Sequence, residues 1–160
     1  MCELTRDNAM TFSELLQSLN ADAHLNINDA LQSGGCTIRF DDNIDITFEN
    51  HDSHVYLFSP VMQITQPLSD DFFASLLQIH LFGIATHRCW FGYNAGGQRI
   101  ILFCLMDLAL LSAEAALKCV ETLIDQAQYW KENLPQIGQA TQASLLDASA
   151  GQRFKRTLTP

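Results

Sequence analysis

The chain has 160 residues, of which 48% are hydrophobic and 17% charged, enough apolar material for one folded domain with a core. Eighteen acidic against nine basic residues give a formal net charge of −9. This acidity excludes nucleic acid and anionic membrane surfaces as expected partners, because both bind proteins through clustered positive charge.

The N-terminal residues have no apolar signal-peptide core, and the most apolar stretch, 100–111, is interrupted by Asp107 and is too short to span a membrane. The five cysteines are odd in number and form no Cys-x-x-Cys pair: they are Cys2, Cys36, Cys89, Cys104 and Cys119. A secreted disulfide framework would normally use an even set. We therefore expect reduced thiols and a cytoplasmic protein.

The first half of the chain predicts one helix followed by three strands. Thr11 and Glu14 form a capping box, which predicts a helix over about 11–23. Apolar and polar residues then alternate over 36–40 and 44–48, as in strands with one solvated face. The segment 54–62 is apolar on both faces and predicts a central strand, with Pro60 near its end or at a bulge.

The second half predicts two helices separated by a hairpin. A helix begins at Ser69 and fades near Gly83, and strands over 88–93 and 98–106 flank the turn 94–97. A third helix begins at Ser112 and is expected to stop at Pro135. Residues 138–160 carry one acidic and three basic residues and no clear apolar period, so we expect a flexible, weakly basic tail.

The predicted element order is therefore α-β-β-β-α-β-β-α within a single domain over 1–137. Strands grouped in hairpins indicate an α+β fold in which a twisted antiparallel sheet packs against helices.

The histidines do not predict a metal site. His51 and His54 flank a turn, while His80 and His87 straddle a helix end and lack the i, i+4 spacing that would place two ligands on one face. No phosphate-binding loop is present either, because the Gly96-Gly97 pair does not join a strand to a helix. We expect no metal and no cofactor.

A catalytic cysteine is also disfavoured. Cys89 lies beside Arg88 and near His87, the elements that could activate a thiol. Its position in an apolar strand favours a packed thiol, so we expect no enzymatic activity. The same strand is apolar on both faces, which favours coverage by a second copy of the chain over burial on both sides within the monomer. The candidate dimer-interface residues are Cys89, Trp90, Phe91 and Tyr93.

Two blocks of the sequence resemble the type III secretion chaperones of the Tir chaperone (CesT) family. One block is the amphipathic segment 11–19 followed by three strands. The other spans 72–134 and includes the Leu76-Leu77 pair, the Cys-Trp-Phe-Gly-Tyr run of 89–93, the Gly-Gly turn and the final helix. The sequence departs from the family pattern in its polar insert, 24–35, and in its tail.

The resemblance implies a homodimeric chaperone of the bacterial cytoplasm. Such a protein binds the N-terminal chaperone-binding segment of one or more secreted effectors, keeps it soluble and delivers it to the secretion apparatus, without nucleotide or metal. A non-secretory adaptor or sensory domain with the same fold is the alternative. A small enzyme built around Cys89 is a second, weaker alternative.

We expect the effector segment to contact apolar residues of the first helix and the first two strands, because peptides bind through apolar anchors and strand pairing. Some of these residues must face the protein's own core, and an arrangement in which all seven do so stays open. The candidates are Leu15, Leu16, Leu19, Ile38, Phe40, Ile44 and Ile46.

Overall fold

The computed structural model describes residues 10–23, 27–41 and 43–155. Its strands are β1 (Gly35–Phe40), β2 (Ile44–His51), β3 (His54–Gln63), β4 (Trp90–Asn94) and β5 (Arg99–Asp107). They form one antiparallel sheet in the order β1-β2-β3-β5-β4. β1 and β4 are therefore the two edge strands.

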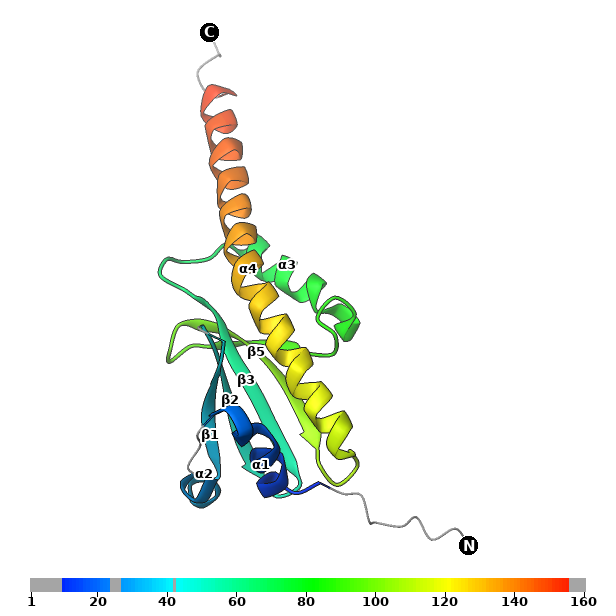
Figure 1. Cartoon of the computed structure of the whole chain (residues 1–160). Helices are drawn as coiled ribbons and strands as arrows, with labels where there is room; N and C mark the ends of the chain where they lie inside the picture. The colour runs from blue at the N-terminus through cyan, green and yellow to red at the C-terminus, as the bar shows by residue number, and fades with distance from the viewer. Residues whose placement is uncertain (1–9, 24–26, 42, 156–160) are drawn as a thin grey trace, which may run out of the picture.

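The helices lie over one face of this sheet (Figure 1). They are α1 (Phe12–Ala23), α2 (Ile27–Ser33), α3 (Asp70–Ile79), the short 3-10 helix η1 (Leu81–Gly83) and α4 (Ala113–Lys155). α4 crosses β2, β3 and β5, so it is the main cover of the core. The predicted α+β element order is confirmed, with α2 and η1 as additions.

Local sequence signals explain where these helices begin. The backbone amide of Thr11 donates to Glu14 Oε2 at 2.7 Å, and the amide of Glu14 donates back to Thr11 Oγ1 at 3.2 Å. This is the predicted capping box. Ser69 caps α3 in the same way by accepting from the amide of Phe72 at 3.2 Å.

The core lies between the helices and the inner face of the sheet. Alternate residues of each strand point inward, as the period of two requires. The inward residues of the three central strands are buried, and they meet buried residues of α1 and α4. The register of β3 against β5 shifts between Pro60 and Met62, which is the predicted bulge.

Two boundaries differ from the sequence-based expectation. The helix expected to stop at Pro135 continues as α4 to Lys155, so that prediction is wrong. Leu134 before the proline and Gly138 after it are both buried. This packing favours a continuous helix, although Pro135 has no backbone N–H to donate to the preceding turn. The polar insert 24–35 contains α2, whose Ala30 is buried.

Candidate functional site

The outer face of the sheet is apolar over β3, β5 and β4. Cross-strand neighbours on this face are Tyr56 with Leu105 and Phe58 with Phe103, and Phe103 also pairs with Trp90. The rings of Trp90 and Phe103 lie 5.8 Å apart between centroids. We call this surface the outer apolar face; its residues are Tyr56, Phe58, Trp90, Ile101, Phe103 and Leu105.

These side chains remain accessible to solvent. The exposed fractions are 40% for Tyr56, 39% for Trp90 and 43% for Leu105, and Phe58 and Phe103 between them are partly buried by their neighbours. Within residues 10–23, 27–41 and 43–155, no helix covers this face. Contiguous exposed apolar surface of this kind is typical of a protein-binding site.

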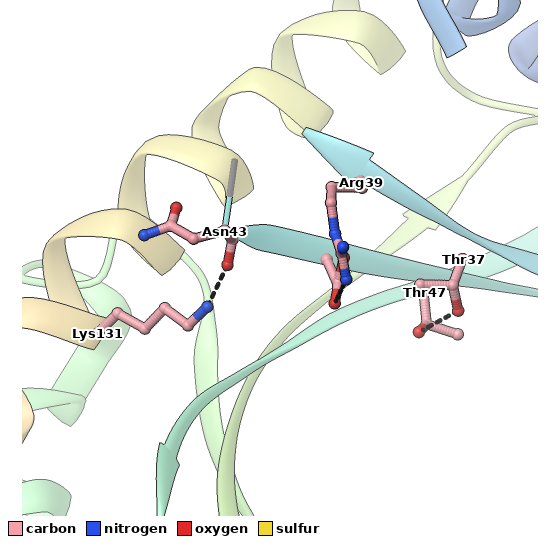
Figure 2. Close-up of polar contacts among 6 residues, drawn as sticks. Thr37, Arg39, Asn43, Thr47 and Lys131 are labelled. Atoms are coloured by element: carbon pink, nitrogen blue, oxygen red, sulfur yellow. Dashed lines mark hydrogen bonds and ion pairs between the residues drawn. The ribbon is translucent and has the colours of Figure 1, made fainter. Parts of the chain in front are cut away.

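The same face is polar over β1 and β2. Arg39 donates to both carboxylate oxygens of Asp45, at 2.7 and 3.0 Å, and the hydroxyls of Thr37 and Thr47 lie 2.9 Å apart (Figure 2). The hydrogen bond from Arg39 lowers the pKa of the Asp45 carboxyl below its usual value. The polar side chains of this half therefore bind one another across the two strands. The apolar part of the face is confined to β3, β5 and β4.

Lys131 joins α4 to the corner of this polar half. Its ammonium group donates to the backbone carbonyl of Asn43 in the turn between β1 and β2 (Figure 2). The contact links the edge hairpin to the helix that covers the core.

Five of the seven candidate effector-binding residues lie in the monomer core. Leu19 and Phe40 are partly buried and pack against that core. The remaining five are 0–3% exposed: Leu15, Leu16, Ile38, Ile44 and Ile46. Of the predicted set, only Leu19 and Phe40 therefore have surface to offer a partner.

Of the four candidate dimer-interface residues, Cys89, Phe91 and Tyr93 lie on the helix-covered side of the sheet, and Trp90 points to the other side. Cys89 and Phe91 are 2% and 8% exposed, whereas Trp90 and Tyr93 are 39% and 54% exposed. Trp90 belongs to the outer apolar face. Tyr93 lies beside Phe73 of α3, with ring centroids 6.3 Å apart.

A second apolar surface lies at the end of α3 and in the segment that leads to β4. Phe82 and Ile84 are 85% and 77% exposed, and Phe82 has a φ of +61°, a conformation that bulky residues rarely adopt. We call this surface the α3–β4 patch; its residues are Leu77, Leu81, Phe82, Ile84 and Tyr93.

Sequence reasoning identified one residue of each surface, Trp90 and Tyr93, as interface candidates and missed the others. The apolar character of 54–62 on both faces indicated only a central strand. Three helices can cover one face of a five-stranded sheet, so the second apolar face needs another cover. Leu81, Phe82 and Ile84 of the α3–β4 patch gave no periodic signal because they lie in the short connection between α3 and β4.

Neither a metal-ligand cluster nor a membrane-spanning helix is found among the described residues. No group of three or more His, Cys, Asp or Glu residues within them could hold a metal ion. Among the described helices, none is both long and apolar enough to cross a bilayer.

Residues 14–131 match the model of the Tir chaperone protein (CesT) family. The chain belongs to this family. Its matched region contains both the outer apolar face and the α3–β4 patch. No curated protein matches the sequence.

Solved structures share the fold. A chain of the ExsC–ExsE complex is 19% identical, with a TM-score of 0.64, and the match covers 83% of this chain and 97% of that one. A chain of the ExoU–SpcU heterodimer from the type III secretion system of Pseudomonas aeruginosa is 12% identical, with a TM-score of 0.59 and coverage of 81% and 99%. A chain of the HopA1–SchA chaperone–effector complex is 15% identical, with a TM-score of 0.56 and coverage of 75% and 89%.

Proposed function

We propose that this family member is a type III secretion chaperone that binds the N-terminal chaperone-binding segment of a secreted effector in the bacterial cytoplasm. The observation that carries the proposal is the outer apolar face, which exposes aromatic and aliphatic side chains on a rigid sheet. Family membership supplies the class of partner, and the similar solved structures include chaperone–effector complexes.

The chemistry of this face suits an unfolded segment better than a small molecule. Tyr56, Trp90 and Leu105 lie along three neighbouring strands, so their side chains form a broad surface. A segment that lays apolar side chains on this surface would lose contact with water and would be held away from its own folding and aggregation partners. Because ordering such a segment costs conformational entropy, a large contact surface is needed.

We also propose that the α3–β4 patch is covered by a second copy of the chain. Leu81, Phe82 and Ile84 are exposed beside β4, and β4 is an edge strand with one side open to pairing. A dimer that buries this patch would carry two copies of the outer apolar face. Tyr93 would belong to this interface.

Gene deletion in the organism that encodes the chain tests the proposed function. We expect the loss of secretion of one or a few type III effectors, with restoration by the wild-type gene and not by Leu105→Asp. Thr37→Asp is the matched control, because Thr37 is exposed on the polar half of the same face. An unchanged set of secreted proteins would favour an adaptor or sensory role instead.

A further inference from the structure

Three cysteines from separate elements line a single cavity. Cys89 directly precedes β4, Cys104 lies on β5, and Cys119 lies in α4. The cavity has a volume of about 390 Å³, and Arg88 and Lys118 also line it. The fourth described free cysteine, Cys36, lies on β1 and does not line this cavity.

The strand register places two of these thiols opposite one another. Trp90 pairs with Phe103, so the same antiparallel register, continued by one residue, sets Cys89 against Cys104. Directly opposed residues have Cα atoms about 4.5 or 5.5 Å apart, within the range of about 4.4–6.8 Å that disulfides span. The two thiols are near enough for each to shift the pKa of the other.

The backbone of Cys89 is held on both sides. Its amide donates to the carbonyl oxygen of Thr86 at 2.9 Å, and the Thr86 hydroxyl donates to the carbonyl oxygen of Cys89 at 2.6 Å. Thr86 is fully buried. These bonds hold the backbone of Cys89 next to the first residue of β4, and its side chain is 2% exposed.

The two thiols differ in acidity. The interaction with Cys104 lowers the pKa of Cys89 against the opposing effect of burial. The interaction with Cys89, together with burial, raises the pKa of Cys104 far above its usual value. Burial also raises the pKa of Cys119. Cys89 is therefore the better nucleophile of the three.

We propose that Cys89 and Cys104 form a reversible oxidation site for hydrogen peroxide that enters the cavity. The Cys89 sulfur attacks the peroxide, the O–O bond breaks, and Cys89 becomes a sulfenic acid as one water leaves. The Cys104 sulfur then attacks the sulfenic sulfur, forming the S–S bond and releasing a second water. Two thiols are oxidised by two electrons, and the peroxide is reduced to two waters.

The two cysteines themselves take no part in the outer apolar face, although Trp90 and Leu105 of that face also line the cavity. The disulfide would link β4 to β5 at the end of the edge strand. A dithiol reductant would reverse it by thiol–disulfide exchange.

Peptide mapping of the full chain after hydrogen peroxide treatment tests the proposal. After unfolding in N-ethylmaleimide and digestion without reductant, we expect the Cys89 peptide joined to the Cys104 peptide, and recovery of both thiols after dithiothreitol. Cys36→Ser and Cys119→Ser should keep this link. In Cys104→Ser, Cys89 should accumulate as a sulfenic acid that reacts with dimedone.

The wild-type map needs no variant and is decisive by itself. Full alkylation of Cys89 and Cys104 after peroxide treatment would overturn the proposal. A link from either residue to Cys119 or Cys36 would overturn it equally, because the assigned pair would be wrong. Circular dichroism before and after treatment checks that the reacting protein is folded.

Discussion

Phe91 on β4 and Trp130 on α4 meet edge to face, with ring centroids 5.2 Å apart and planes inclined at 82°. His80 also lies near Phe91, at 6.4 Å between ring centroids. The edge strand is therefore anchored to the helical layer through its inner side. Trp90, the preceding residue, points the opposite way and stays available on the outer apolar face.

Loss of the Phe91 ring should weaken the fold. Phe91→Ala removes a buried aromatic side chain and leaves a cavity against Trp130, so we expect the free energy of unfolding to fall by about 3–5 kcal/mol. Tyr93→Ala on the same strand removes a ring that is 54% exposed and should cost less. Urea denaturation of both variants measures the difference, and equal losses would contradict the anchoring role of Phe91.

Gly35 is required by a close approach of the backbone. A Cβ at this position would lie 2.3 Å from the carbonyl oxygen of Phe48, whereas a Cβ at Gly96 would meet nothing nearer than 3.6 Å. Gly35→Ala should therefore displace the β1–β2 hairpin and lower the free energy of unfolding by about 1–3 kcal/mol. Gly96→Ala is the matched control and should be nearly neutral; thermal unfolding that ranks the two the other way would refute this.

The α3–β4 patch makes a prediction about oligomeric state. The wild type should sediment as a dimer at micromolar concentration, and Ile84→Asp should shift it to monomer, because a charge would be buried in an apolar interface. Leu110→Asp is the control, since Leu110 is 82% exposed but lies outside the patch. A monomeric wild type, or a variant that sediments unchanged, would contradict the proposed interface.

Removal of the end of α4 should leave the domain intact. A Cβ at Gly138 would touch Met62 and Phe72 at 3.7 Å, so packing on the body extends at least this far along α4. A chain that ends after Gln139 should keep its melting temperature within a few degrees, as expected for a terminus without docking. A large drop in melting temperature would show that 140–160 pack on the domain.

The sequence predicted the regular elements because their signals are local. The capping box at Thr11 and the alternation over 36–40 and 44–48 depend on near neighbours, and all correspond to observed elements. The end of the last helix could not be predicted in this way. Pro135 is a strong local stop signal, but burial of Leu134 and Gly138 against the body favours continuation.

Prediction of the site was limited by the direction of side chains. Leu15 and Leu19 belong to the same apolar stripe, yet Leu15 is fully buried and Leu19 only partly. Sequence periodicity identifies a stripe and not its depth. Tyr56 and Leu105 could not be identified as exposed for a different reason. They lie on strands that are apolar on both faces, and the sequence does not reveal which face the helices leave uncovered.

The central claim is that the outer apolar face holds a segment of a secreted effector. Site-specific photo-crosslinking in the organism that encodes the chain tests it most directly, with the photoreactive residue at Leu105 on the apolar half or at Thr37 on the polar half, where Thr37 lies on the edge strand β1. We predict that position 105, and not 37, crosslinks to the N-terminal segment of a protein that the type III apparatus secretes. Crosslinks confined to position 37, or only to proteins that are not secreted, would contradict the account.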